Sequence, residues 1–478
     1  MRSASADLPE AAGAPPAAVP AVRPWHLPAA AAVASVLVFL LVSGHLIDDA
    51  YITLSYAKNL AFHGHWGLIE DGTANTATSP LNVLVLAAVT FFVRDAVFAA
   101  GVVFVASQVL LVLGLRRLAE QAGLPATFAP LTFGLLLLNP LLLSSIGLEV
   151  ALGAAGVVWT MVYAGERRAA LLGVVIGLLA LTRLDLLLIA LVVFVARREF
   201  WAGIWRTVFA ALLVTVPWFG FSWLVLGSAV PDTLVIKLSQ PAWGPFGFTN
   251  GPLLYWRNFP GATAFSFLPL LVGGLAGVVW LVYYRRGSPT ARRLTPFAAL
   301  AIAGALHYFA YSRLGVPPYH WYYAPSIIGA TIFLAACVCA APGLARHATW
   351  ALAGAILVGS VAVYVLPGLP RRFAPITSNH ASTTEYREIG EQIGALAKGR
   401  KVETAGEIGA LAYSCDCALL DQFSDRGDVD PAIAETKRRS SELTRALLEA
   451  NFYHFDHGVV PQSPDLVLTL TPPPTALA

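Results

Sequence analysis

Long apolar runs separated by short polar loops cover most of this 478-residue chain. An apolar helix of about 20 residues is long enough to cross a bilayer, so the pattern predicts about eleven transmembrane helices. Two neighbouring runs, 169–182 and 185–196, are short for a full crossing, and we expect tilted or broken helices around a polar tip there. The eleven runs are 28–47, 96–115, 125–146, 148–164, 169–182, 185–196, 207–226, 264–284, 294–312, 321–341 and 348–366.

A twelfth apolar run, 79–93, is ambiguous because it is short, begins Ser79-Pro80 and ends at Arg94-Asp95. If it lies along the membrane interface, the arginines of the short loops all fall on one side. If it crosses, they face outward, against the positive-inside rule. We therefore expect 79–93 to lie in the interface and the N-terminus to be cytoplasmic. The arginines concerned are Arg116, Arg117, Arg167, Arg168, Arg197, Arg198, Arg285, Arg286, Arg292, Arg293 and Arg346.

The last part of the chain differs from the rest, since charged residues become frequent after Pro367 and Pro370. Apolar spacing within it predicts helices over 383–398 and 432–450. Short buried strands are expected at Val402, Ala418–Leu420 and Leu466–Leu470. These elements predict a small α/β domain on the outer side of the membrane.

Three regions follow from this pattern. Residues 1–27 are rich in Ala and Pro and are expected to form a disordered cytoplasmic tail. Residues 28–366 form the membrane domain, and 367–478 the extracytoplasmic domain. The fold class is therefore an all-α polytopic protein of the plasma membrane with a small C-terminal α/β domain.

Composition supports this class. Charged residues make up 12% of the chain and hydrophobic residues 57%, and the mean hydropathy is +0.67. Soluble domains contain about 25% charged residues, so soluble, disordered and fibrous classes are excluded. The net charge of +3 gives no indication of nucleic-acid binding. Cys415 and Cys417 are too close in sequence for an easy disulfide bridge.

The strongest chemical signal is Asp48-Asp49, directly after the first span. Carboxylates at a membrane boundary are costly and often functional. The residues that follow predict an amphipathic helix in the interface, with Ile52 and Tyr56 on its apolar side. A carboxylate there can act as a general base on an acceptor hydroxyl. Alternatively, the pair only stabilises the start of the helix.

A second group of polar residues stands at the outer ends of later spans: Glu149, and the pair Arg183 and Asp185. An arginine at membrane depth needs an anionic partner. That partner is either Asp185, close in sequence, or a lipid phosphate, which suits guanidinium geometry. Lys237 in the outer loop is another cation for a phosphate, or else a solvated lysine.

Aromatic residues gather at the start of the tenth span, in Tyr319, His320, Tyr322 and Tyr323. They are either an interfacial aromatic belt or a surface that stacks on sugar and donates hydrogen bonds. His63 and His65 are candidate ligands for a divalent metal, although two histidines without a third ligand are weak evidence for a metal site. No other cofactor is indicated.

Taken in order, these motifs resemble the bacterial GT-C glycosyltransferases, and within them the branch of the mycobacterial terminal arabinofuranosyltransferase. The resemblance covers nearly the whole chain after residue 28. The residues that carry it run Asp48 to Leu60, Thr78 to Leu81, Gly147 to Glu149, Leu181 to Asp185, Pro231 to Thr233 with Lys237, Trp321 to Pro325, Gly406 to Tyr413, and Leu420-Asp421. Where family members often have Pro, Asn and Asp, this chain has Leu184, Asp232 and Glu407.

The resemblance implies an inverting transfer of sugar from a polyprenyl-phosphate donor to a cell-envelope glycan on the outer face of the membrane. It implies that an aspartate of the first outer loop is the base, and we favour Asp48 with Asp49 as its partner. Nucleotide sugars stay in the cytosol, whereas the candidate acids and cations lie outside, so a lipid phosphate is the consistent donor. Arg183 and Lys237 would then stabilise the anionic leaving group.

Two other classes remain open: a glycolipid transporter or flippase, and a non-catalytic scaffold. Transporters of this kind usually contain inverted repeats, and the sequence shows none. A scaffold needs no carboxylate pair. The abundance of Ala and the preference for Arg over Lys are typical of high-GC bacteria such as actinobacteria, which favours arabinofuranose as the sugar. The acceptor and the oligomeric state do not follow from the sequence.

Overall fold

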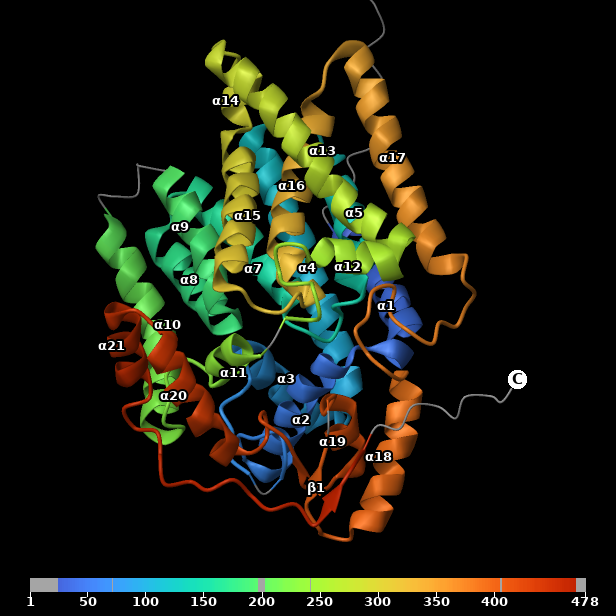
Figure 1. Ribbon diagram of the computed structural model, residues 1–478. Coiled ribbons are helices and arrows are strands. Elements are labelled where there is room, and N and C mark those ends of the chain that lie inside the picture. Colours follow the sequence, from blue (N-terminus) through green and yellow to red (C-terminus); the bar gives the residue numbers. More distant parts are fainter. Residues whose placement is uncertain (1–24, 71, 197–202, 241, 405, 470–478) are drawn as a thin grey trace, which may run out of the picture.

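The computed structural model describes residues 25–70, 72–196, 203–240, 242–404 and 406–469. Upright helices form a bundle, and the C-terminal elements cover its lower end in Figure 1. The expected disordered tail, 1–27, falls almost entirely outside the described residues. The helices up to residue 366 are α1 His26–Val42, η1 Ser43–His45, α2 Asp48–His63, α3 Pro80–Val93, α4 Ala96–Ala122, α5 Phe128–Leu137, α6 Pro140–Leu143, α7 Val150–Gly165, α8 Ala169–Thr182, η2 Leu184–Leu186, α9 Leu187–Ala196, α10 Ile204–Val225, α11 Thr233–Ser239, α12 Gly251–Asn258, α13 Pro260–Arg285, α14 Pro289–Arg293, α15 Thr295–Leu314, η4 His320–Tyr323, α16 Ala324–Ala340 and α17 Gly343–Val365.

Six helical segments of the described chain are long and apolar enough to cross a membrane. They are His26–His45, Ala96–Ala122, Ile204–Val225, Pro260–Arg285, His320–Ala340 and Gly343–Val365. Five shorter apolar helices of 10–17 residues lie among them, including α8 and the segment Leu184–Ala196. The chain is thus a multi-pass membrane protein, as expected, while the number of eleven crossings stays a prediction.

The expected span 125–146 is interrupted. Helix α5 ends at Leu137, and the four-residue helix α6 starts at Pro140. The residue before a proline is disfavoured in helical conformation. Asn139 accordingly takes an extended conformation, and its side chain accepts hydrogen bonds from Leu141 and Leu142 N–H. The break lets residues 144–149 reach the site described below.

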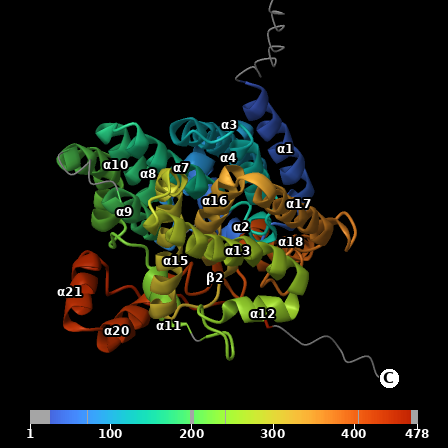
Figure 2. The same ribbon diagram turned by 90° about the horizontal axis from the view of Figure 1, so that it is seen from above.

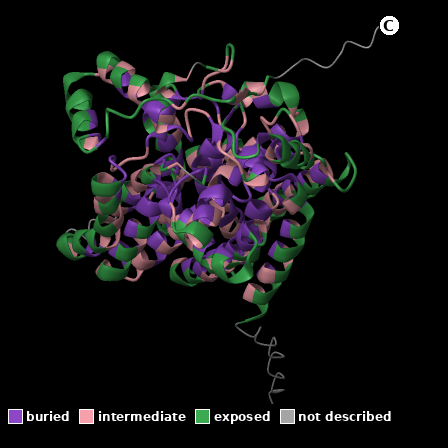
Figure 3. Cartoon of the chain, turned by 90° about the horizontal axis from the view of Figure 1, so that it is seen from below, coloured by how far each residue is buried: buried purple, intermediate pink, exposed green. Residues whose placement is uncertain are grey.

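The helices differ in how they are covered. Helix α16 lies in the centre of the bundle and is buried along most of its length, whereas α10 is exposed along most of its length at the edge (Figure 2). Figure 3 shows the buried residues in the middle and exposed ones around the rim. The exposed side chains of α10 include Phe209, Leu213 and Leu224. A helix with such an apolar outer surface is suited to contact lipid.

The C-terminal segment contains helices and a parallel sheet with strand order β2-β1-β3. Its strands lie where the sequence predicts them, but the expected helix 432–450 is two helices, because Ser440 takes an extended conformation between them. The elements are α18 Thr383–Ala397, β1 Val402–Glu403, α19 Gly409–Cys415, β2 Leu419–Leu420, η5 Arg426–Asp428, α20 Val429–Arg439, α21 Glu442–Asn451 and β3 Leu466–Val467.

This segment shares its hydrophobic core with the membrane region. Buried residues such as Ile376 and Leu411 belong to the same cluster as Tyr51 and Leu54 of α2. The division at residue 367 therefore stays a prediction about chain organisation.

Cys415 and Cys417 form a disulfide, with Cα atoms 5.2 Å apart. The expectation that they are too close to pair is wrong. Asp416 between them has a left-handed φ of 52°, which turns the chain back on itself and brings the two cysteines together.

The arginine-bearing ends of the helices lie away from the C-terminal segment. Arg117, at the end of α4, bonds Glu166, after α7, at 2.5 Å. Arg293 of α14 lies near Gly123 at the same end. Helix α14 is at the top of Figure 1, while α18 to α21 are at the bottom. This separation is what the positive-inside rule requires if the C-terminal segment is outside.

Candidate active site

The site begins at the first turn of α2. Asp48 and Asp49 occupy this turn, where the helix dipole favours negative charge. The helix ends at Gly64, whose φ of 64° gives a left-handed cap. Tyr51 and Leu54 are buried on its inner side. The predicted helix after the carboxylate pair is therefore present, and it fixes the position of both carboxylates.

Asp48 is bound to the C-terminal segment. Its Oδ2 accepts a hydrogen bond of 2.9 Å from Gly409 N–H, and its Oδ1 one of 2.7 Å from Ala410 N–H. A Cβ at Gly409 would lie only 2.0 Å from the Asp48 carbonyl oxygen. Only glycine therefore lets α19 approach α2 so closely, and both carboxylate oxygens of Asp48 are used to hold it.

Asp49 faces a different environment. Both aspartates line a cavity of about 780 Å³ between α2, the loop after α11, and the C-terminal segment, but only Asp48 bonds the backbone of α19. Apart from its own backbone N–H, no group in the described part of the chain forms a hydrogen bond to the Asp49 carboxylate. Burial raises the pKa of Asp49, Lys237 partly opposes this, and Glu149 raises it further. Asp49 is thus a carboxyl group that opens onto the cavity without being consumed by a structural bond.

The cavity wall is acidic, and burial raises the pKa values of its carboxyl groups. The pKa rises to about 7 for Asp48, where Glu407 adds to the effect of burial, and to about 7 for Glu407 and Asp421. Tyr386 donates a hydrogen bond to Glu407, which also accepts from His380 N–H. Each of these groups therefore takes up a proton at a higher pH than an ordinary carboxyl group does.

Lys237 lies in α11 and is fully enclosed by aromatic rings. Its Nζ donates a 3.0 Å hydrogen bond to Tyr322 Oη. It also lies 4.0 Å from the ring centre of Tyr319 and 5.5 Å from that of Trp321. Burial lowers its pKa, but the neighbouring phenols and Asp49 outweigh this, so the pKa is raised overall. Among the described residues no carboxylate forms an ion pair with it, and it is a buried cation, not a solvated lysine.

Arg183, unlike Lys237, is paired with carboxylates. Its guanidinium bonds Asp185 through Nε and Nη2 at 2.9 and 2.7 Å, and Glu149 through Nη1 at 3.0 Å. Tyr311 and His307 complete the cluster, each bonded to Asp185. The sequence suggested Asp185 or a lipid phosphate as the partner of Arg183. The structure supplies two protein carboxylates.

Of the aromatic residues predicted to bind sugar, some lie at the site and others in the packed interior. Tyr319 lines the cavity and Tyr322 bonds Lys237. His320 is fully buried, 3.4 Å from the Ser144 carbonyl. Tyr323 is also buried and stacks on Phe248 with ring centres 4.4 Å apart. Of the four expected sugar-binding residues, two are thus near the cavity and two are in the core.

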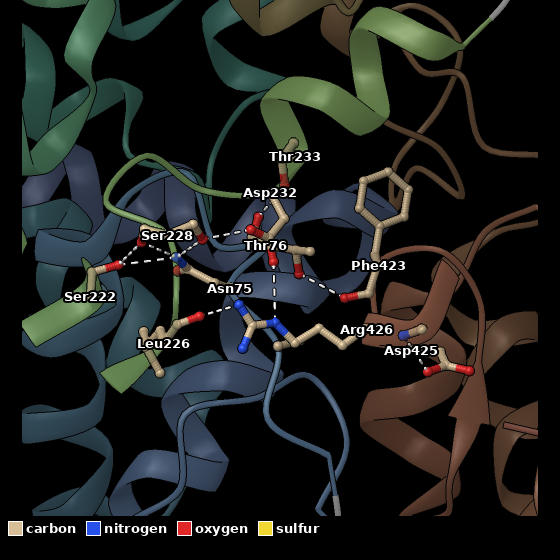
Figure 4. Close-up of polar contacts among 12 residues, drawn as sticks. Asn75, Thr76, Ser222, Leu226, Ser228, Asp232, Thr233, Phe423, Asp425 and Arg426 are labelled. Atoms are coloured by element: carbon tan, nitrogen blue, oxygen red, sulfur yellow. Dashed lines mark hydrogen bonds and ion pairs between the residues drawn. The ribbon is translucent and has the colours of Figure 1, made fainter. Parts of the chain in front are cut away.

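A buried polar cluster fixes the start of α11 (Figure 4). Asp232 accepts a 2.6 Å bond from Ser228 Oγ, and its N–H donates to the Asn75 carbonyl at 2.8 Å. Arg426 of the C-terminal segment lies 3.6 Å from Asp232 and donates to the Leu226 carbonyl. Burial raises the pKa of Asp232 to about 6, although Arg426 opposes this. The cluster joins three segments that are distant in the chain at the start of α11, the helix that carries Lys237.

Sequence reasoning missed part of this arrangement. Asn75 and Arg426 carry no motif, and their partners are far away in the chain. Asp232 stands in a noted motif, but only the contact with Arg426 explains its burial. For Arg426 the only available signal was a cation beside Asp425 in a segment otherwise rich in carboxylates.

The two histidines noted for a metal do not meet a third ligand. His63 lies 3.5 Å from Glu70, and His65 bonds the Gly72 carbonyl at 2.8 Å. Within the described part of the chain, no three His, Cys, Asp or Glu side chains are grouped as metal ligands.

Comparison with known proteins gives the fold. No family model and no curated protein matches the sequence. Among solved structures, the chain is similar to arabinofuranosyltransferase AftD from mycobacteria, with a TM-score of 0.53 and 15% identity over 87% of this chain. It spans only 33% of the length of AftD. It is also similar to ArnT from Cupriavidus metallidurans, with a TM-score of 0.52 and 15% identity over 88% of this chain and 90% of ArnT.

A third similar structure is the archaeal oligosaccharyltransferase AglB from Archaeoglobus fulgidus, in complex with an inhibitory peptide and a dolichol-phosphate. Its TM-score is 0.52, with 12% identity over 89% of this chain and 68% of AglB. The chain has the GT-C glycosyltransferase fold. This confirms the resemblance seen in the sequence at the level of fold. In this fold the segment after α1, with Asp48 and Asp49, lies at the end of the bundle that the C-terminal segment covers.

Proposed function

We propose that the protein is a GT-C glycosyltransferase that moves a sugar from a polyprenyl-phosphate donor to a cell-envelope glycan on the outer face of the plasma membrane. The observation that carries this proposal is the pair of Asp49 and Lys237. A carboxyl group open to the cavity stands within electrostatic reach of a buried cation that has no carboxylate partner among the described residues. This is the combination that a base and a phosphate leaving group require.

The chemistry uses the two groups in separate roles. Asp49 accepts the proton of an acceptor hydroxyl as its oxygen attacks the anomeric carbon of the donor sugar. The bond from that carbon to the phosphate oxygen breaks, and its electron pair leaves with the lipid phosphate. Lys237 stabilises the negative charge that develops there. Attack opposite the leaving group inverts the anomeric centre.

The geometry supports Asp49 as the base, the reverse of the preference stated from the sequence. Asp48 uses both carboxylate oxygens to bind Gly409 and Ala410. A group held in this way positions the C-terminal segment. Asp49, one residue further, keeps its carboxylate for a substrate.

The substrate class is supported by similar structures. AglB is described with a bound dolichol-phosphate, so this fold can hold a polyprenyl-phosphate lipid. AftD is an arabinofuranosyltransferase, which together with the high-GC composition supports arabinofuranose as the sugar. Because the chain spans a third of AftD, the sugar and the acceptor belong to the proposal.

The proposed topology places the N-terminus in the cytoplasm and the C-terminal segment outside. The Arg-bearing helix ends and the C-terminal segment lie at opposite ends of the bundle, which supports this orientation. The disulfide of Cys415 and Cys417 also supports it, since disulfides persist in oxidising compartments. A reporter fused at the C-terminus is expected to be active only if that end is outside, and a cytoplasmic signal would contradict the topology.

The decisive experiment compares two isosteric variants in single-turnover transfer from a polyprenyl-phosphate sugar. Asp49→Asn is expected to slow transfer about 10²–10⁴-fold, because an amide cannot accept the proton, while donor binding remains. Asp48→Asn keeps only one of the two oxygens that accept hydrogen bonds from Gly409 and Ala410. It is expected to lower the stability of the protein, while the transfer rate of each folded molecule changes little. Normal transfer by Asp49→Asn would refute the role of Asp49. Lipid movement across the bilayer without transfer would favour a flippase.

The pH dependence gives a second test. The base must be deprotonated, and its pKa is raised. Transfer should therefore decline with falling pH at a higher pH than an ordinary carboxyl group would give. A rate that stays constant down to the usual aspartate range would contradict a base in this environment.

A further inference from the structure

Helix α21 carries an apolar face that no described part of the chain covers. Leu443 and Leu447 are 73% and 63% exposed, and Ala446 and Ala450 lie on the same side of the helix. Glu442, Arg445 and Glu449 occupy another side. A helix with apolar and charged residues segregated in this way is typical of segments that lie in a membrane interface.

The other side of α21 is firmly attached to the site. Leu448 and Phe452 are buried in a small core with Val235 and Ile236 of α11 and with Ile433 of α20. Asn451 Oδ1 accepts a 2.7 Å bond from Val230 N–H. The exposed face is therefore held in one orientation and is not the outcome of a loosely attached helix.

The place of α21 decides what covers its exposed face. Trp223, near the outer end of α10, donates a 2.9 Å bond to the Ala450 carbonyl. Its ring also contacts those of His454 and Tyr453. In Figure 1 α21 lies beside α10, about level with the lower end of α8, and in Figure 2 it lies outside the outline of the bundle. The apolar face thus continues the lipid-facing surface formed by Phe221, Leu224 and Val225 of α10.

We propose that α21 is an interfacial anchor, whose Leu443 and Leu447 enter the outer leaflet of the bilayer next to α10. Trp223 and Tyr453 would lie at the headgroup level, where such side chains are favoured. The basic run Lys437, Arg438 and Arg439 at the end of α20 would face lipid phosphates. The anchor would hold α11, and hence Lys237, at a fixed height above the membrane. This contact goes beyond sugar transfer and does not depend on it.

The test measures where the two faces of α21 lie in a bilayer. Nitroxide labels are placed one at a time at Leu443→Cys, Leu447→Cys and Glu449→Cys in the full chain, with Cys337 and Cys339 replaced by Ala. Leu396→Cys, an exposed leucine of α18, is the matched control. The protein is held in nanodiscs of phosphatidylcholine and phosphatidylglycerol, and collisions with oxygen and with a water-soluble nickel chelate are measured by electron paramagnetic resonance.

Labels at 443 and 447 are expected to collide with oxygen several-fold more than with the nickel chelate, as lipid-embedded sites do. Labels at 449 and 396 should show the reverse. Equal behaviour of 443, 447 and 396 would place the face in water and overturn the anchor. Exclusion of both reagents at 443 and 447 would overturn it too, in favour of a protein cover such as a second copy of the chain.

A second measurement leaves the cysteines unchanged. Hydrogen exchange in nanodiscs is compared for the unmodified chain, the double variant Leu443→Gln/Leu447→Gln and the control Leu396→Gln. Amides of 443–451 are expected to exchange several-fold faster in the double variant only. Unchanged exchange in a folded double variant would refute the anchor.

Discussion

Two buried cations near the cavity, Lys237 and Arg183, have opposite surroundings. Arg183 is bonded to two carboxylates, Asp185 and Glu149. Lys237 has three aromatic rings and one hydroxyl around it. The charge of Arg183 is thus compensated inside the protein, whereas Lys237 keeps most of its capacity for an anion. Burial alone therefore does not distinguish Arg183 from Lys237, for which we propose a role in binding phosphate; the identity of their partners does.

The largest expected effect is a loss of protein stability when Arg183, the cation paired with two carboxylates, is replaced. Arg183→Met leaves Glu149 and Asp185 buried without their cation, which costs about 3–5 kcal/mol for a buried pair. The free energy of unfolding in mixed micelles should fall by that order. Arg372→Met, at an exposed pair with Glu385, is the control and should lose less than about 1 kcal/mol. Equal losses in the two variants would remove the distinction between the cations.

Replacing Lys237, the cation without a carboxylate partner among the described residues, should affect binding of the donor lipid. Lys237→Met is expected to weaken binding of a polyprenyl phosphate by about 1–3 kcal/mol, the cost of leaving a charged partner unsatisfied. Stability should change little, because no carboxylate loses its partner. Titration calorimetry in nanodiscs measures the affinity, with Lys58→Met as a control at a surface pair with Asp416. Unchanged affinity in Lys237→Met would contradict its role in holding phosphate.

The smallest expected effect comes from removing single tyrosine hydroxyls. Tyr322 is bonded to Lys237 and Tyr311 to Arg183, so each cation can be tested separately. Tyr322→Phe removes the hydroxyl that accepts from Lys237, and Tyr311→Phe removes the hydroxyl bonded to Arg183 and Asp185. Each bond is worth about 0.5–1.5 kcal/mol. We expect Tyr322→Phe to change donor affinity and Tyr311→Phe to change stability. The reverse assignment would show that the roles of the two cations are exchanged.

The sequence predicted those features that depend on neighbours in the chain. The apolar runs locate the membrane helices, and Asp48-Asp49 begins α2 as expected. The proximity of Arg183 and Asp185 made their ion pair one of the two alternatives that the sequence left open. In each case the relevant partners are a few residues apart, so spacing along the chain is also spacing in the structure.

Features that depend on distant contacts could not be predicted in this way. Asp48 and Gly409 are 361 residues apart, and nothing in either motif indicates that one binds the other. The separate roles that we propose for Asp48 and Asp49 rest on that contact. Pro140 is a local indication of the helix break at Asn139. The run 125–146 was nevertheless predicted as one span, because it is hydrophobic along its whole length.

The contact between Asp48 and α19 also bears on how the protein is made. Asp48 is among the first residues to reach the membrane during synthesis, whereas Gly409 and Ala410 are translated after nearly all the helices of the bundle. A chain released after residue 366 could therefore insert its helices and still lack the wall of the cavity, leaving the carboxylate of Asp48 without its two donors. The wall of the cavity that Gly409 and Ala410 help to form would therefore be complete only when translation is almost finished.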